Sequence, residues 1–307
     1  MSKLTLQVRH TTHYAFAQPV VHALQRLRLT PKATQGQRII DWRMICDNAV
    51  AELEYDDQHH NHVTLISLTP GAREVTVTCQ GVVETEDNAG VIGRHAGHLP
   101  LWNFLRQTPL TRAGAKLRAL LREVPGRDLV DREEGAPLDF LHALSALIRG
   151  RIAYETGRTN SRTSAEEAVG QGAGVCQDHA HIFIAAARAS GIPARYVSGY
   201  LLMNDRIEQE ATHAWAEAHL EGIGWVGFDV SNGISPDPRY VRVATGSDYR
   251  DAAPVTGISF GGAAAEVLTV GVAVEAYPLS GQSEGEGQSQ GEGQSQGQSQ
   301  SQGQSTQ

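Results

Sequence analysis

The chain has 307 residues, of which 40% are hydrophobic and 20% are charged, so it can bury a full core, and its length favours two domains. Its formal net charge of -8 excludes the basic footprint of a nucleic-acid-binding protein. No stretch approaches the roughly 18 uninterrupted apolar residues that a membrane span requires. The N-terminal segment MSKLTLQVRHTTHYAF lacks the pattern of a signal peptide. We therefore expect a cytoplasmic protein without a nucleic-acid or membrane partner.

Residues 1–85 predict an N-terminal β-sandwich domain. Turns separate five strand-like runs, at 4–10, 22–30, 38–46, 61–69 and 73–83. Cys46 and Cys79 lie in two of these runs, where buried free thiols are common, and a cytoplasmic setting argues against a disulfide. The cluster HHNH, with His59, His60 and His62, has no Cys or carboxylate at a recognisable ligand spacing. A surface turn therefore explains it better than a metal site.

Residues 86–109 read as a connecting segment, and residues 110–280 as a second domain in which helices precede strands. Helical spacing of apolar residues predicts helices within 110–124 and 138–150, and the segment Thr163–Glu166 resembles a capping box that opens another. The loop GQGAG leads into an apolar helix from residue 176 that ends near Gly191 and Pro193. Strand-like runs follow at 194–202, 212–220 and 224–231. The fold class is predicted to be α+β.

Residues 281–307 are repeats of Gly, Gln, Ser and Glu without an apolar side chain to contribute to a core. This composition predicts a disordered C-terminal tail.

Three residues of the second domain suggest nucleophilic chemistry. Cys176 stands where the apolar helix begins, so unpaired backbone N–H groups and the helix dipole favour its thiolate. Alternation puts His213 on one face of its strand with Trp215, which would shield the imidazole from water. Asp229 ends the next strand and could bond the second ring nitrogen of His213. In this order the thiolate attacks, the imidazole moves the proton and the carboxylate fixes the ring.

The segments that carry these residues resemble the bacterial transglutaminase-like family. They are GVCQDHAHIFIAAARASGIPARYVSGYL and THAWAEAHLEGIGWVGFDVSNG, and the continuation RYVRVATGSDYRDAAPVTG also fits. The resemblance covers nearly the whole chain to about residue 276, including the strand-rich N-terminal domain. It implies a papain-like or transglutaminase-like core, in which a nucleophile helix packs on a small antiparallel sheet. It also implies that Cys176 is the nucleophile, His213 the general base and Asp229 the orienting carboxylate.

Other polar residues around these motifs have less definite roles. Asp178 and His179 fit a structural role near the helix start, and His181 fits the core or a supporting position. Asn232 fits the turn that ends its strand. A second oxyanion donor beside the Cys176 N–H is needed, and Gln171 or Tyr154 could supply it. Glu210 and Glu217 are expected to be isolated and to face solvent.

The sequence leaves several functions open. The first is a thiol enzyme that forms a Cys176 thioester from a peptide or glutamine amide, with hydrolysis, as a peptidase, amidase or deamidase, favoured over transfer to an amine. The second is a protein-glutamine γ-glutamyltransferase, and the third is a non-catalytic scaffold or binding protein. The expected partner is a peptide or protein substrate, and neither a cofactor nor a metal is implied. The oligomeric state stays open.

Overall fold

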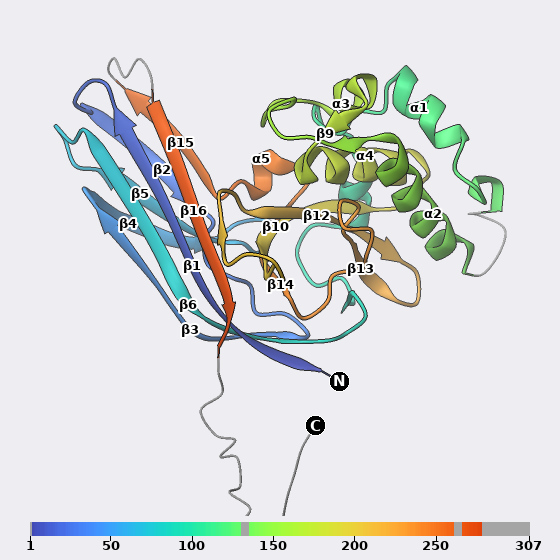
Figure 1. Ribbon diagram of the computed structural model, residues 1–307, viewed down its shortest axis with the longest axis horizontal. Helices are drawn as coiled ribbons and strands as arrows, with labels where there is room; N and C mark the ends of the chain where they lie inside the picture. The colour runs from blue at the N-terminus through green and yellow to red at the C-terminus, as the bar shows by residue number, and fades with distance from the viewer. Residues whose placement is uncertain (1, 130–134, 261–265, 278–307) are drawn as a thin grey trace, which may run out of the picture. The chain divides into compact units, whose positions relative to one another are not determined.

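The computed structural model describes residues 2–129, 135–260 and 266–277. Its elements form a β-sandwich and a core of helices on a sheet (Figure 1). The predicted tail at 281–307 lies outside the described residues. Among the helices that the structure describes, none is both long and apolar enough to cross a bilayer.

Two antiparallel sheets form the sandwich, as the sequence of the first 85 residues predicts. The first sheet has the order β11 (Glu208–Gln209), β16 (Glu266–Ala276), β1 (Lys3–Phe16), β6 (Glu74–Glu86) and β3 (Gln37–Asp47). The second has the order β15 (Val255–Phe260), β2 (His22–Leu27), β5 (His62–Leu68) and β4 (Ala49–Asp56). Every second residue of β6 is buried, and Val77 and Cys79 pack against Leu27 and Ile66 of the other sheet. The period-two pattern therefore builds the closed apolar layer between the sheets.

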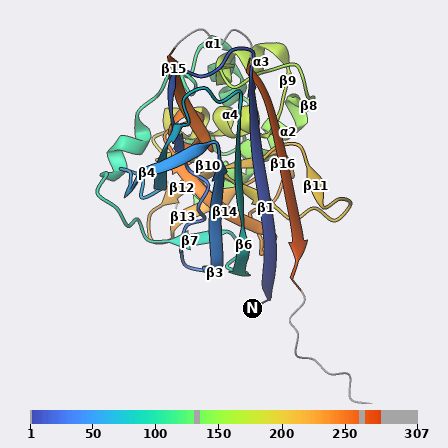
Figure 2. The same cartoon turned by 90° about the vertical axis from the view of Figure 1, so that its left-hand side faces the viewer.

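Two late strands complete the sandwich. Strand β16 pairs with β1 from Leu6–Ala276 to Phe16–Glu266, and β15 pairs with β2. Figure 2 shows β1 between β6 and β16. Both late strands come from the segment that the sequence assigns to the second domain. Conversely, β7 (Val91–Gly93), from the predicted connecting segment, pairs with a strand of the core sheet.

The core sheet is antiparallel, and the helices lie against one of its faces. Its order is β14 (Tyr240–Gly246), β10 (Ala194–Leu201), β12 (His213–Leu220), β13 (Gly224–Phe228) and β7. The α-helices are α1 (Ala115–Arg122), α2 (Ala136–Arg151), α3 (Ala165–Gln171), α4 (Cys176–Ala189) and α5 (Tyr249–Ala252). Two short 3-10 helices, η1 (Leu101–Leu105) and η2 (Arg127–Leu129), and two short strands, β8 (Ala153–Tyr154) and β9 (Ala173–Gly174), complete the core.

Small side chains bring α4 close to the core sheet. Ala214, Ala216 and Ala218 of β12 share an apolar cluster with the buried residues of α4. Because these residues alternate along β12, His213, Trp215 and Glu217 occupy its other face, as predicted. Leu6 and Val83 of the sandwich belong to the same cluster, so the apolar core runs on from the helices into the first sheet of the sandwich.

The capping box of α3 lies one residue later than the sequence suggests. Ser164 is the N-cap and exchanges hydrogen bonds with Glu167, whereas the predicted box spans Thr163 and Glu166. The Glu166 carboxylate instead accepts the backbone N–H groups of Lys116 and Leu117 at 2.8 and 3.0 Å, at the start of α1. Two acidic residues in succession satisfy orphan donors of two different helices.

Candidate active site

A tightly constrained turn places Cys176 at the start of α4. Strands β8 and β9 pair in parallel immediately before it, with Tyr154 opposite Gly174. Asp178 Oδ2 then accepts the Val175 N–H at 2.8 Å and the Thr159 hydroxyl at 2.6 Å. A Cβ at Gly174 would lie only 2.6 Å from the Asp178 Cβ, so this approach requires glycine. The Cys176 thiol consequently sits at the first helical position, where N–H groups lack intrahelical partners and the dipole favours negative charge.

His213 and Asp229 come together from neighbouring strands. His213 is the first residue of β12, and Asp229 directly follows β13. The His213 Nε2 lies 2.6 Å from Asp229 Oδ2, and the Asp229 side chain is fully buried. The imidazole also lies close enough to the Cys176 side chain for that side chain to raise the pKa of His213. The structure therefore brings the three candidate residues into one linked chain in the predicted order.

Two residues that the sequence analysis did not assign to the site also hold the Asp229 carboxylate. Its Oδ2 accepts the Tyr240 hydroxyl at 2.7 Å and the Asn232 Nδ2 at 2.7 Å. The Asn232 backbone N–H also donates to Asp229 Oδ1 at 3.1 Å, so the predicted turn residue helps to position the carboxylate. Burial would raise the pKa of Asp229, but the hydrogen bond from His213, its charge, and the bonds from Tyr240 and Asn232 outweigh it and lower the pKa.

The electrostatics favour a protonated His213. Burial alone would lower its pKa, yet the hydrogen bonds to Asp229 and to Cys176, and the negative charges of both, raise the pKa to about 10. An imidazolium beside a thiol is the arrangement that stabilises the thiolate in thiol enzymes. Such an ion pair can attack a carbonyl carbon and afterwards deliver a proton to the leaving group.

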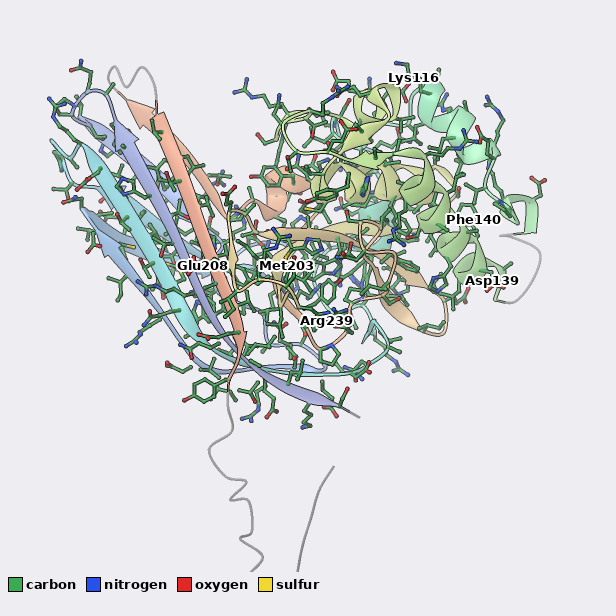
Figure 3. The ribbon with its side chains drawn as sticks, in the orientation of Figure 1. Lys116, Asp139, Phe140, Met203, Glu208 and Arg239 are labelled. Carbon is green, nitrogen blue, oxygen red and sulfur yellow. The ribbon has the colours of Figure 1, made fainter. Side chains whose placement is uncertain are left out.

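Aromatic rings cover one side of His213. The Trp215 ring stacks near the imidazole, with a centroid distance of 6.2 Å and an interplanar angle of 29°, and Trp215 is only 2% exposed. Tyr240 meets Trp215 edge to face at 5.4 Å. Met203, which is labelled in Figure 3, packs against the same cluster. Trp215 therefore lies on the face of β12 that the alternation predicts, where it shields the imidazole of His213 from water.

The two candidates for a second oxyanion donor differ in position. Gln171 is the exposed last residue of α3. Tyr154 lies beside Cys176, because backbone pairing sets it opposite Gly174, and its hydroxyl interacts with the Cys176 side chain. Its ring meets that of His179 edge to face at 6.1 Å, while 56% of the residue is exposed. Burial of the hydroxyl end, followed by the charges of Cys176 and Asp229, raises the pKa of Tyr154 to about 12.

The remaining histidines of α4 hold the surrounding backbone. His179 Nδ1 lies 2.9 Å from the Ser231 hydroxyl, and its Nε2 lies 3.1 Å from the Ile152 carbonyl oxygen. The buried His181 accepts the Tyr249 N–H at its Nε2, at 3.2 Å. Burial lowers the pKa of both histidines, so they are neutral near pH 7. Both contacts fit the structural roles expected from the sequence.

The prediction for Glu217 was wrong. This carboxylate is fully buried and bonds Arg195 Nε at 2.6 Å and Arg242 Nε at 2.7 Å. Burial would raise its pKa, but the two guanidinium groups lower it to about 2. Single-strand alternation could not identify these partners, because Arg195 and Arg242 come from β10 and β14. Glu210 is exposed, as expected.

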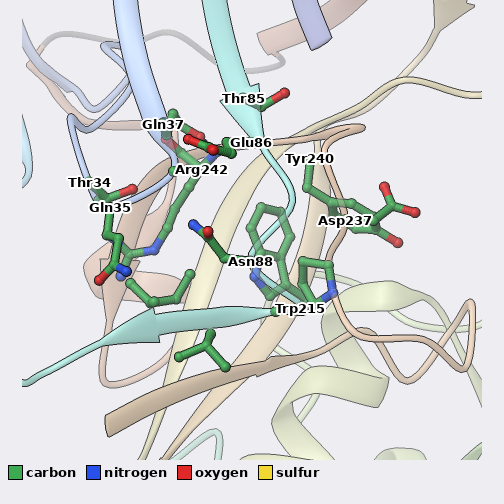
Figure 4. A pocket seen from close by; sticks show the side chains of 15 residues that line it. Thr34, Gln35, Gln37, Thr85, Glu86, Asn88, Trp215, Asp237, Tyr240 and Arg242 are labelled. Carbon is green, nitrogen blue, oxygen red and sulfur yellow. The ribbon is translucent and has the colours of Figure 1, made fainter. Parts of the chain in front are cut away.

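A small cavity lies behind the aromatic shield. It has a volume of about 50 Å³, and its wall includes Asn88, Trp215, Tyr240 and Arg242 (Figure 4). None of the three candidate residues lines it. A space of this size holds water and cannot take a peptide side chain, so we do not place the substrate there.

The HHNH cluster makes separate contacts rather than a shared centre. His59 Nε2 pairs with Asp251 at 3.2 Å, whereas the His60 ring stacks on that of His98. Within 2–129, 135–260 and 266–277, no group of three or more His, Cys, Asp or Glu side chains is arranged to hold a metal ion.

Comparisons with known proteins identify two family regions in the chain. Residues 127–230 match the model of the transglutaminase-like superfamily, and residues 6–84 match that of the bacterial transglutaminase-like N-terminal region. An uncharacterized protein from Mycobacterium tuberculosis is 30% identical over 296 residues, which cover 90% of this chain and 94% of the relative. One from Mycobacterium leprae is 29% identical over 283 residues, covering 86% and 96%.

A solved structure shares the fold along nearly the whole chain. It is described as a putative cysteine protease from Cytophaga hutchinsonii, with a TM-score of 0.71 and 23% identity, and the match covers 91% of this chain and 92% of that one. The family match and the linked Cys, His and Asp side chains support a thiol enzyme in general. The chain belongs to the transglutaminase-like superfamily and carries the bacterial transglutaminase-like N-terminal region.

Proposed function

We propose that this protein is a thiol amide hydrolase that acts on peptide or glutamine amide bonds through a thioester on Cys176. The observation that carries the proposal is the arrangement of Cys176, His213 and Asp229, in which the fully buried Asp229 lies 2.6 Å from His213 and Cys176 interacts with the imidazole. Nucleophilic catalysis by a thiol needs these three roles in this order.

The reaction proceeds in two steps. The Cys176 thiolate attacks the carbonyl carbon, and the C=O electron pair moves onto oxygen. On collapse the C–N bond breaks, and the His213 imidazolium gives its proton to the departing nitrogen, which leaves a thioester. Water then attacks the thioester and loses a proton to His213, and the second collapse releases the carboxylic acid and the Cys176 thiolate.

Charges around the site favour water over a lysine amine as the acceptor. Glu217 is bound by Arg195 and Arg242, so its carboxylate cannot recruit an ammonium group. Because water is present at high concentration, transfer of the acyl group to an amine competes with hydrolysis only where a preorganised site holds the amine.

Mass spectrometry of a peptide library after incubation tests the proposal. Cleavage, deamidation and amine incorporation change the mass of a peptide differently, so one experiment reports all three. We expect cleavage or deamidation with wild type and neither with Cys176→Ala. A library left unchanged by folded, unlabelled wild-type protein would favour the scaffold alternative.

A transferase is the second candidate, because the same thioester can be captured by an amine. A glutamine-containing peptide and a labelled primary amine separate the two outcomes. Incorporation of the amine that exceeds deamidation and cleavage together would establish a protein-glutamine γ-glutamyltransferase and overturn the hydrolase.

A further inference from the structure

Tyr154 is held beside the nucleophile by a dedicated piece of backbone. The Ala153 N–H donates to the Gly172 carbonyl oxygen, and the Glu155 N–H to that of Gly174, both at 2.9 Å. These bonds fix the residue on each side of Tyr154 to the turn that leads into α4. The backbone of Tyr154 is therefore paired with β9, the two-residue strand that leads into Cys176.

The hydroxyl of Tyr154 is a permanent donor at working pH. Because its pKa is raised to about 12, the phenol keeps its proton throughout the range in which the His213 imidazolium exists. In the free enzyme the hydroxyl interacts with the Cys176 side chain. Once sulfur is acylated it carries no charge and accepts hydrogen bonds weakly, so the O–H is released for a stronger acceptor.

The geometry points to Tyr154 as a catalytic residue that donates its hydroxyl hydrogen bond to the oxyanion, together with the Cys176 backbone N–H. In the first step, sulfur forms its bond to carbon while the negative charge moves from sulfur to the carbonyl oxygen. The hydroxyl that donates a hydrogen bond to the thiolate then donates to the oxyanion, because the charge moves from sulfur to an oxygen bound to the same carbon. This inference rests on the proposed thiol chemistry and adds a residue to it.

Exposure of the ring fits this role. With 56% of the residue accessible, Tyr154 borders the approach to Cys176, whereas Trp215 is buried behind His213. A donor that must meet the substrate carbonyl has to lie on the open side of the sulfur. Gln171 is exposed at the end of α3, whereas backbone pairing fixes Tyr154 opposite Gly174, two residues before Cys176, so we assign the donor to Tyr154.

Two reagents that attack the same sulfur test the assignment. Acylation by p-nitrophenyl acetate passes through an oxyanion, whereas alkylation by iodoacetamide does not. In Tyr154→Phe we expect the acylation rate at Cys176 to fall about 10²-fold, the usual effect of removing one oxyanion donor. The alkylation rate at Cys176, read by mass spectrometry, should stay within about tenfold of wild type, since only one hydrogen bond to the thiolate is lost.

The matched control is Tyr55→Phe, which removes an equivalent hydroxyl from the exposed edge strand β4 of the sandwich. Both of its rates should equal those of wild type. Equal falls in acylation and alkylation for Tyr154→Phe would mean that the phenol only supports the thiolate, and unchanged rates would mean that it does neither; either result overturns the inference. If wild type itself is not acylated at Cys176, the proposed function fails instead.

Discussion

The Tyr240 hydroxyl donates to Asp229 Oδ2 at 2.7 Å, the same oxygen that lies 2.6 Å from His213 Nε2. Tyr240 is the first residue of β14 and lies eleven positions after Asp229 in the sequence, so a residue from a separate strand holds the carboxylate in place. A buried carboxylate oxygen with several donors is fixed in place and stays ionised. Tyr240 is therefore a positioning residue that acts on His213 through Asp229.

Tyr240→Phe should lower kcat about tenfold or somewhat more, the range found when a supporting hydrogen bond behind a site is removed. KM should change little, because Tyr240 is buried and does not line the approach to sulfur. The upper limb of the kcat against pH curve should also move, since Asp229 loses one donor. A drop in kcat with an unmoved pH profile and a lowered Tm would assign Tyr240 to packing alone.

Asp229→Asn should lose less activity than His213→Ala. The amide can still orient the ring in part but cannot stabilise the imidazolium, whereas the alanine variant has no group to move the proton. By analogy with serine-protease triads, kcat should fall about 10⁴-fold and about 10⁶-fold, respectively. Steady-state kinetics on any cleaved library peptide measures both. An asparagine variant as active as wild type would reassign Asp229 to structure.

Activity should persist into alkaline solution and decline as the pH rises through about 10. The pKa of His213 is raised from 6.5 to about 10, and the imidazolium is the form that protonates the leaving group. Because the fold stabilises the protonated ring, this contribution to stability is complete below about pH 6.5 and disappears as pH rises through about 10. The pH profile of kcat/KM and of the unfolding free energy, each against His213→Gln, measures both effects. An upper limb near pH 6.5 would show that the ion pair does not form.

Glu217→Gln should destabilise the protein by about 3–5 kcal/mol, because two guanidinium groups would remain buried with a neutral partner. The matched control is Glu210→Gln at an exposed position, which should change stability by less than about 0.5 kcal/mol. Since the pKa of Glu217 is lowered to about 2, its stabilisation is present above about pH 4.5 and is lost as pH falls through about 2. Urea unfolding at pH 7 compares the variants. Equal stabilities would mean that solvent reaches the Arg195–Glu217–Arg242 network.

Local sequence patterns were sufficient for most elements of the core and for the three candidate residues. The helix from 176 and the strands at 194–202, 212–220 and 224–231 match α4, β10, β12 and β13 to within a few residues. Period and cap signals are local, so they can be seen in a single sequence. The linked arrangement of Cys176, His213 and Asp229 could be expected because each sits at the end of an element, where side chains of neighbouring elements converge.

Long-range partners could not be predicted in the same way. The pairing of β15 and β16 with β2 and β1 joins residues more than 200 positions apart, and no local pattern records it. Strand β4 escaped detection because it is almost entirely exposed and shows no alternation of buried residues. Tyr240 and the arginine partners of Glu217 reach their sites from other strands, so only the fold reveals them.

The most direct test of the central claim is to trap the acyl-enzyme. Wild type is mixed with an amide peptide that it cleaves or deamidates, quenched in acid within the first turnover, and mapped by mass spectrometry. We predict that the acyl group of the peptide is found on Cys176, that it disappears on longer incubation as the free acid accumulates, and that Cys176→Ala carries none. Product formation without an adduct at Cys176, or an equal yield of product from Cys176→Ala, would contradict the account.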